Sequence, residues 1–353
     1  MKRMTKIALW CGGALITGGL ILCFCAMLLV QFDIMKLDPM PEYTAKSYTR
    51  EIVDFAQIYT ETKNTPIIVK PSKDEQMHIT YYENKYETYT ISDSSPVFEM
   101  EYQNTKKWYQ YISFSFLNGI SSLQNQMIIE LPSTYKEGLQ LVTSNNTITI
   151  SDFPSLGDVA GTTSNGAITV SNVNTNHLTG KTTNAAIRFE DVAVIDKLHA
   201  VTTNAPLTFK NLSAHTIYSE TSNSSISFNQ LSADGRIEAS ASNASITLTD
   251  THAQDLICDT SNAKITSTRS DAAKLVDFNT SNGAITFDTF SSDDINLKTS
   301  NSPISGMVAG ALSEYSIVTK TSNADNSLMN KPNGNKKLSV VTSNGKIDVA
   351  FIQ

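Results

Sequence analysis

Charged residues are scarce in this chain, and proline and tryptophan are rare. Only 17% of the 353 residues are charged, with 16 glycines and 10 prolines, which excludes a coiled coil, a collagen-like rod and a proline-rich stalk. The formal net charge of -7 argues against a nucleic-acid partner. Hydrophobic residues make up 40% of the chain, so we expect a folded protein with a real core.

Cysteine is also rare, and it is unevenly placed. Cys11, Cys23 and Cys25 fall in an apolar N-terminal run, which leaves Cys258 alone in the rest of the chain. An internal disulfide is therefore impossible outside that run. The phase of Cys258 in the pattern described below predicts a buried, inert thiol rather than a nucleophile.

The N-terminus carries a basic start followed by a long uncharged run. Lys2, Arg3 and Lys6 precede the run from Ile7 to Phe32, whose 26 residues can cross a hydrocarbon core about 30 Å thick. The basic residues place the short N-terminus in the cytoplasm by the positive-inside rule, with the rest of the chain outside. We predict a cell-membrane protein with a single span.

Two other interpretations of this run are a cleaved signal peptide and a lipoprotein signal. The run is longer than a typical signal core, no A-x-A-like cleavage site follows it, and the residues before the three cysteines are not small. The predicted organisation is a cytoplasmic N-terminus (1–6), a transmembrane helix (7–32) and an extended tether (33–47), followed by two β regions.

The second β region is an internal repeat. A Thr/Ser-Asn step, usually followed by a small residue, recurs every 19 to 22 residues over 137–353. Its asparagines are Asn145, Asn165, Asn184, Asn204, Asn223, Asn243, Asn262, Asn282, Asn301, Asn323 and Asn344. A period this regular predicts one structural unit used eleven times.

Each unit has the alternation of strands with one buried face. The third residue after the Asn is nearly always Ile or Leu, the fifth is mostly apolar, and the residue between them is mostly Thr or Ser. The sixth residue before the Asn is always apolar, and the fourth is often small, as in Gly180 and Ala200. The pattern predicts two short strands that flank an Asn corner around a narrow interior.

Two architectures fit this pattern, a parallel β-solenoid and an antiparallel meander with Asn-Gly hairpin turns at Asn165, Asn282 and Asn344. The solenoid is favoured because a corner Asn can bond the coils above and below it, and Asn tolerates a left-handed corner. We therefore predict an all-β fold, a parallel β-solenoid (β-helix) of about eleven coils stacked ~4.8 Å apart in chain order, with a structural asparagine ladder.

The first β region, residues 48–136, has strands without a clean period. Eleven of the 13 tyrosines fall between Tyr43 and Tyr135. It is either an irregular β cap that closes the end of the solenoid or an aromatic binding surface, and the cap is favoured because an exposed end coil needs covering.

The basic start, the single span, the Ile129-Glu130-Leu131-Pro132 step with Tyr135, and the Thr-Ser-Asn-Gly-x-Ile units together resemble the bacterial membrane-anchored "putative adhesin" family, a domain of unknown function. The resemblance covers about residues 48–353 and implies a β-solenoid ectodomain on the cell surface, adhesin-like, and in some relatives tied to cell-envelope stress operons. It supplies no catalytic residues. The chain departs from the pattern at Asn326, where Ile is expected, and in a polar insertion, Asn330–Lys337.

Residues that could carry chemistry are dispersed. Asp152, Asp191 and Asp250 share one corner position but are two or three coils apart, which is typical of solvated turns rather than of a metal site. Four histidines, His177, His199, His215 and His252, occupy four different phases of the repeat. We predict no catalytic, cofactor or metal residues, and hence a protein that is not an enzyme.

Two functions remain open. The first is a membrane-anchored, adhesin-like binding or scaffolding module whose partner is a cell-wall polymer, a glycan or an envelope protein. The second is an accessory or regulatory subunit of a cell-envelope stress or signalling system. The sequence identifies neither the ligand nor the oligomeric state.

Overall fold

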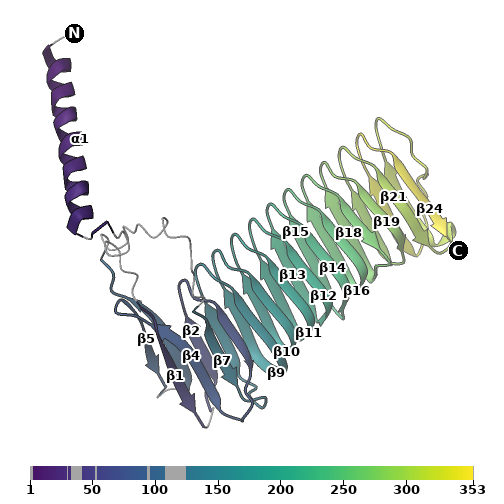
Figure 1. Ribbon diagram of the computed structural model, residues 1–353. Helices are drawn as coiled ribbons and strands as arrows, with labels where there is room; N and C mark the ends of the chain where they lie inside the picture. The colour runs from purple at the N-terminus through teal and green to yellow at the C-terminus, as the bar shows by residue number, and fades with distance from the viewer. Residues whose placement is uncertain are drawn as a thin grey trace. The chain divides into compact units, whose positions relative to one another are not determined.

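The computed structural model describes residues 3–29, 31–32, 42–51, 54–93, 96–107 and 125–352 (Figure 1). The chain divides into two compact units: one is Met1–Ala45, Tyr82–Thr88 and Gln103–Asn125, and the other is Lys46–Tyr81, Tyr89–Tyr102 and Gln126–Gln353. The first unit contains helix α1, and the second contains the repeats.

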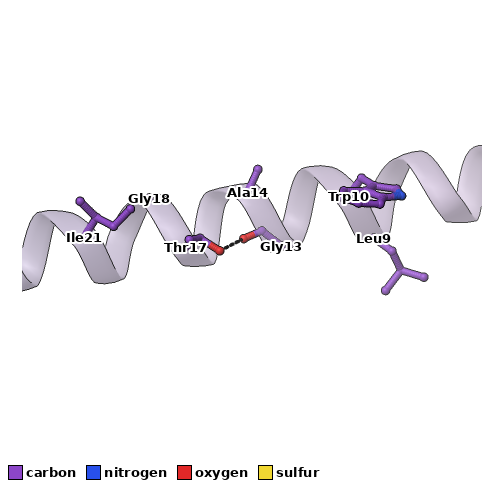
Figure 2. A pocket seen from close by; sticks show the side chains of 7 residues that line it. All are labelled: Leu9, Trp10, Gly13, Ala14, Thr17, Gly18 and Ile21. Atoms are coloured by element: carbon purple, nitrogen blue, oxygen red, sulfur yellow. Dashed lines mark hydrogen bonds between the residues drawn. The ribbon is translucent and has the colours of Figure 1, made fainter.

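Helix α1 (Arg3–Leu29) includes the apolar run. Its part Lys6–Leu29 has a mean hydropathy of 2.2 and is long and apolar enough to cross a membrane. The Thr17 hydroxyl donates to the Gly13 carbonyl at 2.8 Å, which satisfies the polar group within the helix. A shallow groove along one side of the helix (Figure 2) is lined by Leu9, Trp10, Gly13, Ala14, Thr17, Gly18 and Ile21.

The other regular elements of the described ranges are strands and one short 3₁₀ turn. The first region contains β1 (Thr44–Arg50), β2 (Gln57–Glu61), β3 (Ile67–Pro71), β4 (Met77–Glu83), β5 (Glu87–Ser92), β6 (Val97–Asn104) and β7 (Met127–Leu131). The repeats contain β8 (Gly138–Val142), β9 (Ile148–Thr162), β10 (Ile168–Lys181), β11 (Ile187–Val201), β12 (Leu207–Ala214), β13 (Thr216–Thr221), β14 (Ile226–Ala233), β15 (Arg236–Ala241), β16 (Ile246–Thr260), β17 (Ile265–Thr268), β18 (Asp271–Thr280), β19 (Ile285–Phe290), β20 (Asp294–Lys298), β21 (Ile304–Ala309), η4 (Leu312–Glu314), β22 (Tyr315–Lys320), β23 (Lys336–Val341) and β24 (Ile347–Ile352).

The repeat strands pair in parallel, with equivalent residues side by side. Ile168 lies beside Ile148 on one edge and Ile187 on the other, and the same column continues through Leu207 and Ile226. The predicted all-β parallel β-solenoid is therefore confirmed, and an antiparallel meander is excluded for these strands.

The left-handed corner lies elsewhere than we expected. Positive φ angles of 47° to 69° occur seven residues after the ladder asparagines, at Asp152, Asn172, Asp191, Asn211, Gln230, Asp250 and Arg269. None of the eleven ladder asparagines is among the described residues with positive φ. Asn and Asp tolerate a positive φ, and in this solenoid they do so at the second corner of the coil rather than at the ladder corner.

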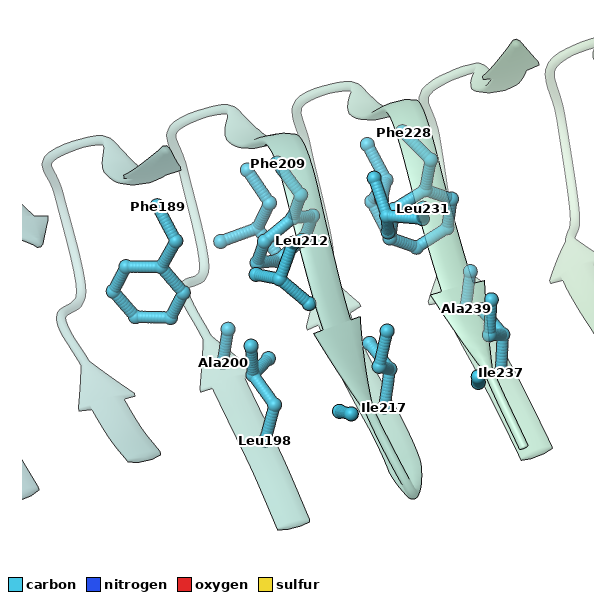
Figure 3. Close-up of a cluster of buried hydrophobic side chains, with 14 of the residues drawn as sticks. Phe189, Leu198, Ala200, Phe209, Leu212, Ile217, Phe228, Leu231, Ile237 and Ala239 are labelled. Carbon is cyan, nitrogen blue, oxygen red and sulfur yellow. The ribbon is translucent and has the colours of Figure 1, made fainter. Parts of the chain in front are cut away.

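The interior is filled by pairing large with small side chains. Phe189, Phe209 and Phe228 point into the interior from one side of the solenoid. The small residues Ala200 and Ala239 lie opposite them, on the other side (Figure 3). A Cβ added at Gly180 would lie 2.9 Å from Cζ of Phe189, so the glycine makes room for the ring. The order is reversed in one coil, where Ser267 is small and Phe278 is large, which keeps the interior filled.

At the N-terminal end, residues 57–71 form a solenoid coil of their own. Strand β2 pairs in parallel with β8 on one edge and β6 on the other, and β3 pairs likewise with β9 and β7. Strand β4 then pairs antiparallel with β7. This coil lies within 48–136, and β6 and β7 provide the layer that covers it.

At the C-terminal end, the coils do not follow chain order. Strand β23 lies between β20 and β22, pairing in parallel with both, and β24 pairs with β21. The last coil of the sequence is therefore an internal coil, and the coil that begins with β22 is outermost. Asn326, which stands where Ile is expected, forms a parallel bridge with Ile347, and Leu328, at the next inward position of the repeat, is buried.

Candidate functional site

All eleven predicted asparagines lie in one column. Each side-chain amide donates to the side-chain oxygen of the Asn in the preceding coil at 2.6 to 2.9 Å. The column runs in chain order to Asn301, then to Asn344, and ends at Asn323. The column lies between the strands, at one corner of each coil, and its hydrogen bonds connect successive coils.

A twelfth member, Asn64, begins the column and was missed at the sequence level. Asn145 donates to Asn64 at 2.7 Å across 81 residues of chain. The signal was present, because Ile58, Ile67 and Val69 stand at the repeat's apolar offsets from Asn64 and are fully buried. The long separation hid it from a search for a fixed period.

A second, buried column stands behind the asparagines. The residue two before the Asn is usually Thr, and its hydroxyl donates to a carbonyl of the preceding coil, as Thr182 does to Gly166 at 3.1 Å and Thr299 to Gly283 at 2.9 Å. Where the corner is Asn-Gly, the glycine N–H also donates to this hydroxyl at 3.1 Å. The sequence signal for it was the Thr of the repeated Thr-Ser-Asn.

The corner aspartates take part in side-chain hydrogen bonds between coils. Asn172 donates to Asp152 at 3.0 Å, and Arg269 donates to both carboxylate oxygens of Asp250 at 2.6 and 2.8 Å. The Asn172 hydrogen bond lowers the pKa of Asp152, and Arg269 lowers that of Asp250. Among the described residues no group of three or more His, Cys, Asp or Glu is arranged to hold a metal ion.

The histidines are separated, and most have an aspartate neighbour. Nδ1 of His215 lies 2.8 Å from Asp234, and Nδ1 of His252 lies 2.5 Å from Asp271. His177 lies 4.0 Å from Asp158 and 3.8 Å from Asp196. His199 instead packs edge-on against Tyr218, with ring centroids 5.0 Å apart. Cys258 is fully buried, and burial raises the pKa of its thiol.

A fifth histidine, His78, was not singled out from the sequence. Its Nε2 lies 2.7 Å from Asp74, and its Nδ1 lies 3.2 Å from the Thr49 hydroxyl. The three border a pocket of about 370 Å³, which Lys73 and Glu130 also line. Asp74 is mostly exposed, so the arrangement is a solvated hydrogen-bond chain.

A polar surface lies on one outer side of the solenoid, and we call it the polar face. Two rows of outward side chains follow neighbouring strands in register from β11 to β20. The polar face consists of His199, Tyr218, Glu220, Glu238, Ser240, Asp259, Asp277, Asn279, Asn296 and Lys298, and the same two rows contain the apolar residues Val201 and Ile257. A groove of about 480 Å³ crosses it beside Asp259, Asn279 and Lys298, near the Ser residues of the asparagine corner.

Carboxylates dominate the electrostatics of the polar face. Tyr218 donates to Glu220 at 2.6 Å, which raises the pKa of the tyrosine to about 12. Partial desolvation and the nearby charge of Asp277 raise the pKa of Asp259. Desolvation lowers the pKa of His199, which favours its neutral form. The polar face thus offers an aromatic edge, amides and carboxylates to a ligand.

Part of the chain matches the model of a known protein family. Residues 55–215 match the model of the family Toastrack DUF4097. Over these residues the chain is similar to the Toastrack family. The resemblance to an adhesin-like family of unknown function is thereby confirmed, and the match begins where the coil of Asn64 begins. The Toastrack match ends before Tyr218, so the polar face from that residue onward lies in the repeats that follow it.

Three solved structures are similar to the chain, at 8 to 14% identity. They are a "putative cell adhesion protein" from Clostridium sporogenes (8% identity, 89% of this chain and 100% of that one, TM-score 0.21), a "putative lipid binding protein" from Parabacteroides distasonis (14%, 88% and 97%, 0.25) and a "putative adhesin" from Bacteroides fragilis (10%, 89% and 99%, 0.24). No curated protein sequence matches the chain.

Proposed function

We propose that this chain is a single-pass cell-membrane protein whose β-solenoid is displayed outside the cell and binds an extracellular polymer without catalysis. The proposed span is residues 7–32, with residues 1–6 in the cytoplasm. The tether that we predicted over 33–47 lies mostly outside the described residues, and its last part, from Thr44, belongs to β1. The apolar α1 and the basic residues before its apolar part support this orientation.

The observation that carries the binding proposal is the polar face. Its side chains are spaced by the distance between parallel strands, about 4.8 Å, so a linear polymer lying across the coils meets a polar group in most coils, with the apolar Ile257 between Glu238 and Asp277. Hydroxyl, amide and carboxylate groups beside the Tyr218 ring suit a cell-wall glycan, which presents hydroxyl donors and apolar sugar faces. Several weak contacts of this kind add up along one polymer chain.

Binding is tested with the purified full-length chain and isolated cell-wall glycan. We expect Tyr218→Ala and Asp277→Asn to weaken retention about tenfold each, because one loses the aromatic contact and the other a charge-assisted hydrogen bond. Thr247→Ala, on the outward row of another side, is the matched control and should bind like the unmodified chain.

Equal binding by all four proteins would contradict the polar face as the site. Absence of glycan binding in the unmodified chain would contradict the adhesin-like function and favour the accessory role in an envelope system.

A further inference from the structure

The C-terminal coil occupies an interior position that the chain itself leaves open. In the sequence, β23 and β24 come after β20, β21 and β22. In space, they lie between the coil of β20 and β21 and the coil that begins with β22. We call Lys336–Ile352 the inserted segment, and the space that it fills between the coils of Asn301 and Asn323 the slot. The chain must pass over the slot, form the outer coil and then return.

The inserted segment makes the contacts of an ordinary internal coil. Asn344 donates to Asn301 at 2.8 Å and accepts from Asn323 at 2.6 Å. Leu338 lies between Ile295 and Ile317 and is buried. Both edges of β23 are hydrogen-bonded in parallel register, so the slot recognises an extended segment by its backbone and by alternate apolar side chains.

The link before the inserted segment is short and tightly bent. Lys331 is fixed on the outer edge of β22, where its N–H donates to the Ile317 carbonyl at 2.9 Å and its carbonyl accepts from the Ile317 N–H at 2.6 Å. Asn333 has a left-handed φ of 69°, and a Cβ on Gly334 would lie 2.1 Å from the carbonyl carbon of Tyr315. Residues 332–335 are therefore a compact hinge, and short strained hinges favour exchange of a terminal element between copies.

We propose that the slot is a strand-binding site whose ligand is the inserted segment, taken from a second copy of this chain as well as from its own. In the exchanged form the hinge extends, and the contacts between the inserted segment and the slot are made between two molecules. This inference stands independently of the polymer-binding proposal, because it involves none of the polar-face residues tested there.

The test uses co-expressed, differently tagged full-length chains in which Cys11, Cys23 and Cys25 are replaced by Ala. One chain carries Val318→Cys and the other Ser339→Cys. These positions are register partners that point outward across the β22–β23 pair. Neighbouring strands bring their Cα atoms within the 4.4–6.8 Å that a disulfide spans. A heterodimer linked through them requires the inserted segment of one chain in the slot of the other.

The matched control is a pair of chains with Ala160→Cys and Thr179→Cys, register partners at equivalent outward positions of internal coils. We expect about tenfold more covalent heterodimer from the Val318/Ser339 pair than from this control. A single chain with both Val318→Cys and Ser339→Cys should close an internal disulfide, which verifies the register.

Equal heterodimer yields from the two pairs would mean random collision and would overturn the proposal. So would the absence of a heterodimer when the doubly substituted chain closes its internal disulfide.

Discussion

Single side chains decide how well each coil fits its neighbours. Most inward positions carry apolar groups, and the inward hydroxyls are hydrogen-bonded in most coils, as the buried threonine column illustrates. Ser267 is an exception among the described residues, because its buried hydroxyl lies in register between Leu248 and Phe287 without a hydrogen-bond partner.

Replacing Ser267 with Ala should stabilise the protein. The substitution removes an unsatisfied buried hydroxyl at almost constant volume, which is worth about 1–2 kcal/mol in the free energy of unfolding. Urea unfolding measures the change. Ser219→Ala is the control, since Ser219 is equally buried but donates to the Glu238 carbonyl at 3.3 Å, and it should be destabilising. A loss of stability in Ser267→Ala would contradict the assignment.

The Arg269–Asp250 contact should make stability depend on acid pH. Asp250 has a native pKa below its ordinary value of 3.8, so its contribution is complete above that pH and is lost as the pH falls through the lower native value. We expect the stability difference between the unmodified chain and Arg269→Ala to be constant near neutrality and to vanish in strong acid. Unfolding followed at a series of pH values checks this.

Arg269→Lys is the companion variant for that experiment. It keeps the charge but cannot reproduce the two hydrogen bonds to Asp250, so it should give a smaller, similarly directed effect. A difference that does not change between neutral and acid pH would contradict the linkage.

At the scale of the element, each coil is held to the next by strand pairing and by the corner columns. The threonine column has a gap at Ala241, which stands where neighbouring coils have Thr221 and Thr260. In those coils the hydroxyl donates to Ala205 at 3.3 Å and to Ala244 at 3.1 Å. The corresponding acceptor for position 241 is the Ser224 carbonyl.

Ala241→Thr should therefore close the gap. We expect a gain of about 0.5–1.5 kcal/mol in the free energy of unfolding, the usual net value of one hydrogen bond. Ala241→Val is the control with similar shape and no hydroxyl, and it should not show this gain. Equal stability of the Thr and Val variants would indicate that the column contributes packing only.

For the whole molecule, the repeat makes the coil the unit of length. Because each internal coil contacts its neighbours alone, removing a complete unit brings equivalent surfaces together. Deletion of residues 205–223 joins Asn204 to Ser224 and leaves Phe189 next to Phe228 in the core.

We expect this deletion to give a folded solenoid shorter by one strand spacing, about 4.8 Å, with a lower unfolding midpoint. Small-angle X-ray scattering and thermal unfolding measure the two effects. Deletion of half a unit, residues 205–214, is the control and should abolish cooperative unfolding, since it places inward residues out of phase. Similar behaviour of the two deletions would contradict a modular solenoid.

The periodic part of the chain could be predicted from sequence because it depends on local alternation. Every apolar offset from the Asn, such as Ile187 and Phe189 after Asn184, is set within one unit, and the parallel stacking follows when units are alike. The outward positions of the polar face follow the same rule, because Tyr218, Glu238 and Asp277 each stand five residues before a ladder asparagine. That they lie in one row depends on the parallel register, since a slip of one residue would turn them inward.

The sequence by itself determined the coil, its buried positions and the asparagine corner, since these repeat within about twenty residues. Only the tertiary structure decided the order of coils at both ends. Asn64 joins Asn145 across a long insertion, and Asn344 lies between Asn301 and Asn323. The local sequence does not specify these neighbours, because nearly identical coils present nearly identical strand edges. Which edge each strand meets depends on packing over the whole end of the solenoid.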